Sequence, residues 1–521
     1  MQDLNSVATI GQALQKAAID RGGATGWIAN DQPISWTEMN ASTRRLACGF
    51  LRAGFRLGDR IGIIALNQVE WLQIFFAATR IGLVVVGMSV RYRDNELNFM
   101  VHDSRVKALF TLSAHAGFSF SDMLRRLAEQ MPSLEHVIGL DRQYDGESLN
   151  FEALIATPVD EDALHRAELA VTSADLAMVI YTSGTTGRPK GAGLTHASLL
   201  ASAGSQARHT RITGGDLQQL SLPFNHVGGI TCGILTFLIG GGTVELVPEF
   251  RPDVVIDMMT THPPTVIGAV PTMLTLLLMH PRFASVNLDN LRLIVSGGAN
   301  LDAPLINRLR QRVPHATLMN LYGLSESSGA IVMTPWNCSE ADLLTPVGTR
   351  FADAEVKVVD PMGQILATNS VGELCFRGCG VIPGYVGLTV DAGGFDAQGW
   401  LHTGDLGSVD ERGYITLKGR AKDMYVQGGF NVYPVEIENF IAQHPKVLLV
   451  AGIGVPDPVL GEVGRFYIIP RPGSALEDQE ILDWCRASLA DYKVPRQVVL
   501  RESLPLTPAG KIQKSALRDE R

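Results

Sequence analysis

The sequence lacks paired cysteines, a surplus of positive charge and a signal-like N-terminus. Its six cysteines are scattered along 521 residues without metal-ligand or disulfide spacing, which favours a reduced setting. A formal net charge of -9 gives no general reason to expect nucleic acid or an anionic membrane surface as a partner. Residues 1–5 show no basic stretch before an apolar core, so we expect no secretory signal and a cytoplasmic location.

Long apolar runs, internal repeats and low-complexity tracts are also scarce. The stretch 228–244 runs 17 residues without a charge, close to the length of a membrane-spanning helix. Three successive glycines, Gly240, Gly241 and Gly242, interrupt it and predict a short buried helix followed by a strand. We therefore expect no membrane span, and the absence of repeats excludes solenoids and propellers.

What the sequence does contain is the alternation typical of α/β proteins. Apolar runs at 61–66, 177–181 and 291–296 predict buried strands, and the helical period at 70–81 predicts a helix. After Asp405 the pattern changes to short strands and turns. With 46% hydrophobic residues the chain can bury more than one core, so we expect an N-terminal domain of residues 1–420 and a C-terminal domain of residues 421–521.

Residues 181–191, Tyr-Thr-Ser-Gly-Thr-Thr-Gly-Arg-Pro-Lys-Gly, form the most informative segment. Glycines allow backbone N–H groups to approach an anion, hydroxyls add donors, and Lys190 adds positive charge, which together predict a phosphate-binding loop. An arbitrary loop of this composition is more often an ordinary turn. Arg188 and Pro189 do not fit the P-loop of nucleotide hydrolases, and no glycine triad of dinucleotide-binding type follows the strand.

These residues resemble the signature of the adenylate-forming, or AMP-binding, superfamily, which includes acyl-CoA and aryl-CoA synthetases and carrier-loading adenylation domains. Further motifs follow in the family's order, at 296–300, 320–326, 400–405, 418–424, 426–438 and 505–512, so the resemblance covers nearly the whole chain. It implies an α/β fold with a large N-terminal domain of layered β-sheets flanked by helices, and a small mobile α+β C-terminal domain. It also implies ATP, Mg²⁺ and coenzyme A as reactants and cofactor.

The resemblance assigns nucleotide binding to one residue set. In it, Tyr322 faces adenine, Asp405 accepts hydrogen bonds from the ribose, and Arg420 also contacts the ribose. The full set is Thr182, Ser183, Gly184, Thr185, Thr186, Gly187, Lys190, Gly298, Ala299, Asn320, Tyr322, Ser325, Asp405 and Arg420. Glu326 would be the Mg²⁺ ligand, a hard oxygen donor suited to that ion. Ser325 stands where the family commonly has Thr, and it keeps the hydroxyl.

The catalytic set implied by the resemblance is Lys511, Lys190, Glu326 and Ser325. Lys511 would enter the site for adenylation, and most lysines near a C-terminus otherwise only solubilise the surface. Lys422 would be the hinge about which the small domain rotates between two half-reactions. The CoA-binding residues would be Gly428, Gly429 and Phe430, although a buried hairpin turn also requires glycines.

For the organic acid, the resemblance points to His226, Gly229, Val270 and Met273 as the acyl pocket. A lone histidine is usually a hydrogen-bonded structural residue, and only the family analogy suggests that His226 gates the pocket. Segments 222–229 and 267–274 offer no Arg or Lys for a second carboxylate, so we expect a neutral monocarboxylic acid with an aliphatic, alicyclic or aryl body. The predicted function is an ATP-dependent acid–CoA ligase that works through an acyl-adenylate, in a monomer or a homodimer.

One alternative to this function stays open, and two others are disfavoured. A stand-alone enzyme that loads a carrier protein would share the first step, and sequence does not decide the acceptor. A catalytically silent adenylate-binding protein is disfavoured because Lys190, Glu326 and Lys511 are all present. Membrane-anchored lipid handling is disfavoured because the chain has neither a spanning segment nor a polybasic one.

Overall fold

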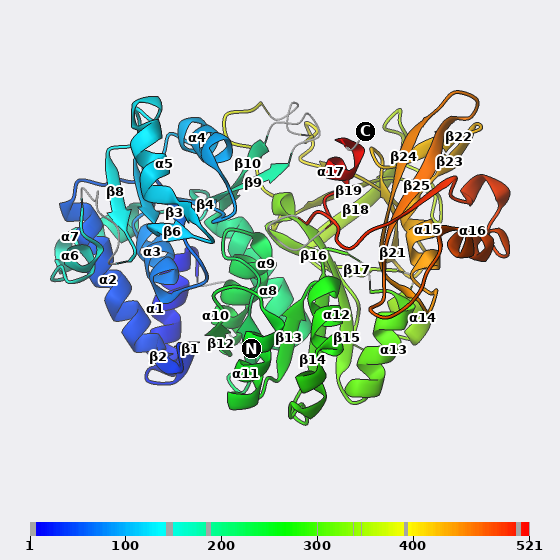
Figure 1. Ribbon diagram of the computed structural model, residues 1–521. Coiled ribbons are helices and arrows are strands. Elements are labelled where there is room, and N and C mark those ends of the chain that lie inside the picture. The colour runs from blue at the N-terminus through cyan, green and yellow to red at the C-terminus, as the bar shows by residue number, and fades with distance from the viewer. Residues whose placement is uncertain are drawn as a thin grey trace.

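The structure, a computed structural model, describes residues 7–141, 149–183, 189–299, 301–336, 338–344, 346–389, 394–506 and 512–519. It is a mixed α/β fold in which three sheets and their helices form a large N-terminal part, and a smaller sheet with its own helices forms a C-terminal part (Figure 1). The layered arrangement predicted for the fold class is confirmed.

A six-stranded sheet carries the predicted phosphate-binding segment. Its central strands are buried and parallel, which is why they read as continuous apolar runs. In order across the sheet its strands are β10 (Pro189–Thr195), β9 (Leu176–Ser183), β4 (Val84–Met88), β3 (Arg60–Ile64), β5 (Ala108–Thr111) and β8 (His136–Gly139). The strands expected at 61–66 and 177–181 are confirmed, as is the helix expected at 70–81, which is α3 (Val69–Arg80).

A nine-stranded sheet and a four-stranded sheet complete the N-terminal part. The nine-stranded sheet runs β13 (Val266–Ala269), β14 (Leu293–Gly297), β15 (Thr317–Leu324), β16 (Gly329–Met333), β17 (Gly348–Arg350), β21 (Tyr414–Arg420), β20 (Leu401–Val409), β19 (Gly372–Gly378) and β18 (Ala354–Val359). The four-stranded sheet runs β11 (Leu217–Leu220), β12 (Thr243–Leu246), β1 (Thr25–Ala29) and β2 (Gln32–Ser35). A small hairpin pairs β6 (Ala114–His115) with β7 (Phe118–Ser119).

Helices fill the space around and between these sheets. Helix α8 packs against β10 of the six-stranded sheet and β16 of the nine-stranded sheet, and so joins the two. The N-terminal helices are α1 (Ile10–Arg21), α2 (Trp36–Arg52), α3, α4 (Asp94–Asp103), α5 (Phe120–Leu127), α6 (Phe151–Ile155), α7 (Glu161–Ala170), α8 (His196–Thr210), α9 (Val227–Gly229), α10 (Thr236–Gly240), α11 (Pro252–Thr261), α12 (Pro271–Met279), α13 (Ala303–Arg312) and α14 (Glu340–Leu344).

Local sequence signals explain where the long helices begin. Ser35 caps α2 by accepting the backbone N–H of Glu38, whose carboxylate in turn accepts the N–H of Ser35. Thr195 caps α8 in the same way through the N–H of Ser198. Helix α2 buries Trp36, which packs edge-to-face on Trp27 of β1 at a ring-centroid distance of 4.6 Å.

The charge-free stretch 228–244 folds as predicted into short helical turns and a strand. Helix α9 continues into a π-helical turn (Ile230–Leu235) and α10, and after Gly241, whose φ is +90°, the chain enters β12. In the part of the chain that the structure describes, no helix is long and apolar enough to cross a membrane.

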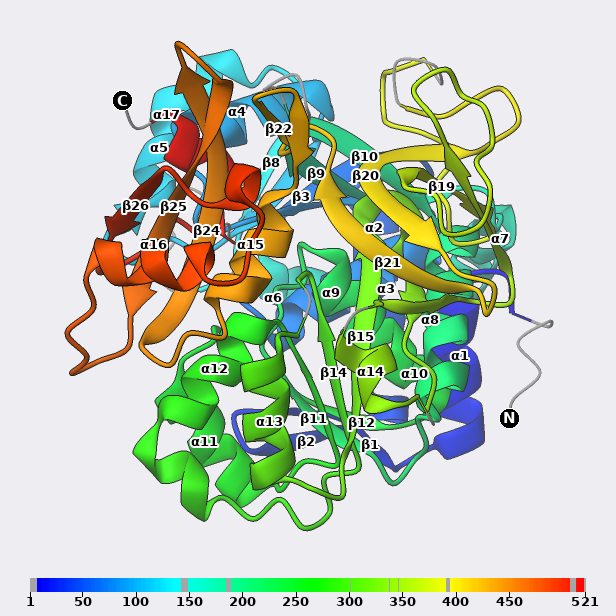
Figure 2. The ribbon, with the colours of Figure 1, turned by 90° about the vertical axis from the view of Figure 1, so that its right-hand side faces the viewer.

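The C-terminal part is a second sheet with helices on it. Its strands are β23 (Phe430–Val432), β22 (Tyr425–Gln427), β25 (Gly461–Pro470), β24 (Val447–Asp457) and β26 (Gln497–Leu500), and its helices are α15 (Pro434–Ile441), α16 (Asp478–Arg486) and α17 (Lys514–Asp519). In both views it lies above α12 and α13 (Figure 2). The chain leaves the nine-stranded sheet at Arg420, the last residue of β21. We propose this residue as the boundary between the two domains.

Candidate functional site

The predicted phosphate-binding loop lies between β9 and β10, which pair as an antiparallel hairpin. In this register Thr182 is opposite Lys190 and Tyr181 is opposite Gly191. Residues Gly184, Thr185, Thr186, Gly187 and the side chain of Ser183 lie outside the described part of the chain. The hairpin therefore places Thr182 and Lys190 side by side at the base of the loop.

Glu326 lies next to this hairpin on a short 3-10 turn, Ser325–Ser327, that follows β15. Its Oε1 accepts a hydrogen bond from the Thr182 hydroxyl at 3.5 Å and a second, shorter one from the hydroxyl of Tyr385. The ammonium group of Lys190 lies 5.3 Å from the centre of the Tyr385 ring. Two residues of the 181–191 segment, Thr182 and Lys190, are thus brought together with Glu326 from the motif at 320–326.

Tyr385 is the member of this cluster that sequence reasoning missed. Burial raises its pKa, and the charge of Glu326 and the hydrogen bond to it raise it further, so the phenol stays protonated and donates. Its backbone forms a bridge with Ala192, while the N–H of Val386 donates to the carbonyl of Gly191. In the sequence it is visible only as a tyrosine that follows Pro383 and Gly384, and this pattern does not indicate a catalytic or binding role.

Asp405 lies on β20 and forms a second cluster with two other predicted residues. Its Oδ2 accepts the hydroxyl of Tyr322 at 2.7 Å, and its Oδ1 lies 3.0 Å from Nε of Arg420, the residue paired with it on β21. Burial and the charge of Asp405 raise the pKa of Tyr322 well above its usual range. Each carboxylate oxygen can accept further hydrogen bonds, so the cluster can still receive ribose hydroxyls.

A half-buried carboxylate, that of Glu373, holds the strand that carries Asp405. Oε1 of Glu373, on the neighbouring β19, accepts the backbone N–H of Gly404 at 2.8 Å. Its Oε2 lies 3.1 Å from Nδ1 of His402. Glu373 therefore fixes both residues that flank Thr403, and with them the position of Asp405.

Of the remaining predicted nucleotide residues, Gly298, Ala299 and Ser325 follow the carboxyl ends of β14 and β15, and Asn320 lies within β15. Gly298 has φ +85° in the turn after β14, followed by Ala299, and Ser325 is buried. The amide of Asn320 bonds the protein itself, because Oδ1 accepts the N–H of Leu301 and Nδ2 donates to the carbonyl of Leu343. Asn320 thus holds the segment after Gly298 in place.

A cavity that is open to solvent on one side lies beside these turns. Its walls come from β11, α8, α10 and the ends of β13, β14 and β15. Among the described residues that line it none is Asp, Glu, Lys or Arg. The lining includes Leu220, Leu222, His226, Cys232, Phe237, Val266, Val270, Val295, Leu321 and Met333.

Two of the four predicted acyl-pocket residues, His226 and Val270, belong to this lining. The other two lie behind it. A Cβ on Gly229 would be 2.3 Å from the carbonyl oxygen of Pro223, so this glycine packs against backbone. The sulfur of Met273 lies 3.9 Å from the Ser221 hydroxyl.

His226 has a structural role at the cavity. Its Nδ1 accepts the backbone N–H of Gly228 at 3.0 Å and so caps α9. A neutral ring in this position carries its proton on Nε2. The ring is therefore held in one orientation on the cavity wall.

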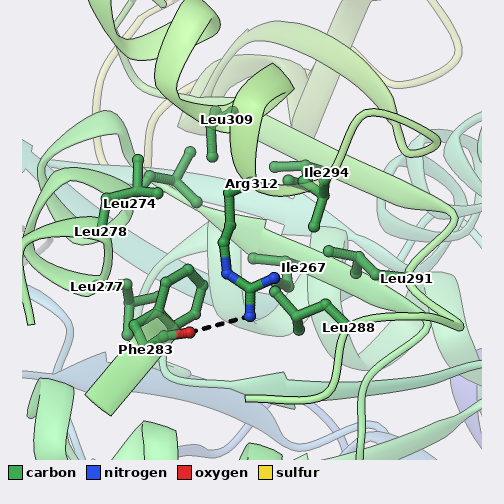
Figure 3. Close-up of a pocket in the computed structure, with 11 residues that line it drawn as sticks. Ile267, Leu274, Leu277, Leu278, Phe283, Leu288, Leu291, Ile294, Leu309 and Arg312 are labelled. Carbon is green, nitrogen blue, oxygen red and sulfur yellow. Dashed lines mark hydrogen bonds between the residues drawn. The ribbon is translucent and has the colours of Figure 1, made fainter. Parts of the chain in front are cut away.

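A second, smaller cavity lies within the layer of α12 and α13, and no predicted site residue lines it. Leucine and isoleucine side chains surround it, and Arg312 extends across it to donate to the carbonyl of Phe283 at 3.0 Å (Figure 3). Because this guanidinium serves backbone carbonyls, the cavity is part of the core and no candidate for catalysis.

The C-terminal part carries the remaining predicted residues. Gly428 and Gly429, with φ +59° and +86°, form the two-residue turn between β22 and β23. Phe430, 56% exposed, stacks on Tyr492 at 4.6 Å. Burial lowers the pKa of Lys422, whose carbonyl accepts a hydrogen bond from Arg518. Lys511 lies outside the described residues.

Comparison with known proteins agrees with this geometry. A family model described as "AMP-binding enzyme" matches residues 13–386, and one described as "AMP-binding enzyme C-terminal domain" matches residues 436–511. A 3-(7a-methyl-1,5-dioxo-octahydro-1H-inden-4-yl)propanoyl:CoA ligase of Mycobacterium tuberculosis is 33% identical over 99% of both chains. Feruloyl-CoA synthase of an Amycolatopsis species is 32% identical over 93% of both.

A solved structure gives the same result for the fold. ATP-bound MatB from Rhodopseudomonas palustris superposes with a TM-score of 0.84 at 28% identity, covering 98% of both chains. The family models, the relatives along the full length of the chain and the clustered motif residues agree, and the chain belongs to the AMP-binding enzyme family.

Proposed function

We propose that this chain is an ATP-dependent acid–CoA ligase that activates a neutral monocarboxylic acid as its acyl-adenylate and then transfers the acyl group to coenzyme A. The observation that carries the proposal is the common position of three features. The Thr182–Glu326–Tyr385 cluster, the Tyr322–Asp405–Arg420 cluster and the apolar cavity all meet around the ends of β14 and β15. Nucleotide and acid would therefore be held in contact.

In the first step a carboxylate oxygen of the acid forms a bond to the α-phosphorus of ATP, and the bond from that phosphorus to the bridging oxygen breaks as pyrophosphate leaves. Lys190 and the hydroxyl of Thr182, side by side on the hairpin, would oppose the charge that grows on the departing phosphates. Lys511 would bridge the carboxylate and the α-phosphate. Tyr322, Asp405 and Arg420 would hold the adenosine.

Glu326 fits the family's magnesium ion. Its carboxylate is a hard oxygen ligand, and its Oε1 already accepts two hydroxyl donors, which hold it in place. When bound there, Mg²⁺ supplies charge neutralisation for the phosphates. Tyr385 and Thr182 would keep the carboxylate oriented toward the phosphate-binding hairpin.

In the second step the thiolate of CoA attacks the acyl carbon, and the bond to AMP breaks to give the thioester. We place the acceptor at the Gly428–Gly429 turn, whose backbone carries no side chain that would block close approach. Rotation about Lys422 would exchange Lys511 for this turn. No covalent bond to a cysteine of the protein is needed.

The substrate class follows from the cavity. A charged group on the distal part of the acid would be desolvated without a partner, because the described lining has no ionisable side chain besides His226 and Cys232. The two relatives named above act, by their names, on an alicyclic propanoyl group and on a feruloyl group. The apolar lining of the cavity supports the inclusion of acids with such ring systems in the proposed substrate class.

The test is release of AMP and pyrophosphate with a panel of fatty, aryl and alicyclic acids, each with and without CoA. Acid-dependent release that accelerates with CoA, with a thioester as product, is the expected result. Acid-dependent pyrophosphate exchange without a CoA product would favour a carrier protein as acceptor. Absence of acid-dependent turnover across the panel would contradict the proposal.

A further inference from the structure

Gln218 is a polar residue in the wall of an otherwise apolar cavity. It lies on β11, where the side chains of Gln218 and Leu220 share one face of the strand and both line the cavity. Only 3% of Gln218 is exposed. A glutamine buried to this extent normally has partners for both ends of its amide.

The amide of Gln218 is incompletely paired. Its Nε2 is buried and has no hydrogen-bond acceptor among the residues that the structure describes. Across the cavity wall lies Gly268 of β13, and a Cβ built there would be 3.2 Å from Oε1 of Gln218. The absence of a side chain at Gly268 keeps the space beside the amide open.

Other polar side chains of the cavity wall donate their hydrogen bonds to groups of the protein. Nε2 of Gln206 donates to the carbonyl and the hydroxyl of Ser202. The hydroxyls of Thr210 and Thr236 donate to backbone carbonyls within their own helices. Gln218 is thus the cavity-lining amide whose donor is left for a ligand.

Gln218 lies toward the end of the cavity that is away from the predicted nucleotide residues. Leu222, Val270 and Gly298 follow the carboxyl ends of β11, β13 and β14, beside the nucleotide residues, whereas Gln218 is the second residue of β11. Four residues of extended chain span roughly 13 Å. The amide is therefore placed to contact the distal part of a bound acid.

We propose that Gln218 makes the enzyme selective for acids whose hydrophobic body carries a carbonyl oxygen at its far end, with Nε2 of Gln218 as the donor to that oxygen. This inference rests on the proposed function and adds its substrate class. An acid without the carbonyl leaves the amide buried and unpaired, which disfavours it by roughly ten- to a hundredfold. A second carboxylate is not accepted, since no cation is available to pair with it.

The test compares two acids on the full-length enzyme. One is a cyclohexyl-alkanoic acid with a ketone on the ring carbon farthest from the chain, and the other is the same acid with a methylene there. The pair is made with propanoic, butanoic and pentanoic chains, and kcat/KM for AMP release is measured for each. We expect the wild type to prefer the ketone acid at least tenfold at one chain length or more.

The variant Gln218→Met removes the amide while keeping a side chain of similar length. We expect it to reduce the preference to about twofold or less, by slowing the ketone acid and improving the methylene acid. Gln206→Met is the matched control, because it makes the same change on the cavity wall where the donor already has partners, so its preference should follow the wild type.

Two results would overturn the inference while leaving the ligase function intact. One is a wild type that turns over both acids equally at every chain length, an outcome that needs no variant. The other is a preference that survives in Gln218→Met. If no acid supports AMP release, the proposed function fails instead, so the two failures are distinguishable.

Discussion

The hydroxyl of Tyr385 donates to the same carboxylate oxygen of Glu326 that accepts the hydroxyl of Thr182. Two neutral hydroxyl donors on one oxygen hold the carboxylate in one orientation. The ring of Tyr385 also lies beneath the ammonium group of Lys190. One residue therefore positions both the proposed metal ligand and the cation of the phosphate-binding hairpin.

Replacing Tyr385 by phenylalanine separates these two effects. Tyr385→Phe keeps the ring under Lys190 but removes the donor to Glu326, and a hydrogen bond to a charged group contributes about 1.5–3 kcal/mol. We expect acid-dependent pyrophosphate exchange to fall by about 10- to 100-fold and to require more Mg²⁺. Tyr385→Leu, which also removes the ring, should be slower still. Equal Mg²⁺ dependence in wild type and Tyr385→Phe would show that the hydrogen bond does not act on Glu326.

Glu373 is expected to influence ATP binding without touching ATP. Glu373→Gln weakens the acceptor for the N–H of Gly404 and should loosen the strand that presents Asp405. We expect a roughly tenfold higher KM for ATP with a smaller change in kcat. Glu355→Gln is the control, because Glu355 pairs with Arg377 on the protein surface, where ion pairs contribute little. A kcat loss without a KM change would contradict this positioning role.

Local patterns in the sequence predict much of this fold for definite reasons. The strand at 61–66 and the helix at 70–81 are visible because buried parallel strands are continuously apolar and helices have a period of 3.6. The clustering of Thr182, Lys190 and Glu326 is anticipated only because the family resemblance assigns all three to one site, although they are up to 144 positions apart.

The parts that sequence misses depend on which side chain lies behind another. Tyr385 reaches Glu326 only because its backbone bridges to Ala192, and nothing in the residue types near 385 signals that pairing. Gly229 and Met273 were expected in the acyl pocket, but they are not among the residues that line it, because Gly229 packs against the carbonyl of Pro223 and Met273 against Ser221. Gln218 was not expected in the pocket, because its unpaired amide becomes apparent only from the burial of the side chain in the structure.

His196 should make stability depend on pH. It begins α8, and its Nδ1 accepts the N–H of Ile10 at 3.1 Å, which ties α1 to α8. Burial lowers the pKa of His196 from 6.5 to about 4. As pH falls below 6.5 the unfolded chain gains a proton that the folded chain does not, so the free energy of unfolding decreases until about pH 4. Near pH 4, His196 alone has lowered the free energy of unfolding by about 3 kcal/mol relative to its value above pH 6.5.

The variant His196→Asn keeps an acceptor for Ile10 but cannot titrate. We expect its urea midpoint to fall less than that of the wild type between pH 7 and pH 4.5, which is measured by circular dichroism at matched ionic strength. Because carboxylates titrate in both proteins, only the difference between the two curves reports on His196. Parallel curves would mean that this histidine does not control the acid sensitivity.

The two-step mechanism makes its sharpest prediction at Lys511. If this lysine bridges the carboxylate and the α-phosphate only during adenylation, Lys511→Ala should lower acid-dependent pyrophosphate exchange by at least about a hundredfold, as expected for loss of a charged transition-state contact. Conversion of supplied acyl-adenylate and CoA to thioester should stay within a few-fold of the wild type, since the lysine has no role in that step.

Lys514→Ala gives the matched control for that experiment. Lys514 is three positions farther along and pairs with Glu438 at 2.6 Å, so its loss removes a nearby positive charge without removing the proposed catalytic group. Both half-reactions should continue in this variant. If Lys511→Ala lost both half-reactions equally, the lysine would be required for folding or for binding common to both steps, and its assignment to adenylation would be wrong.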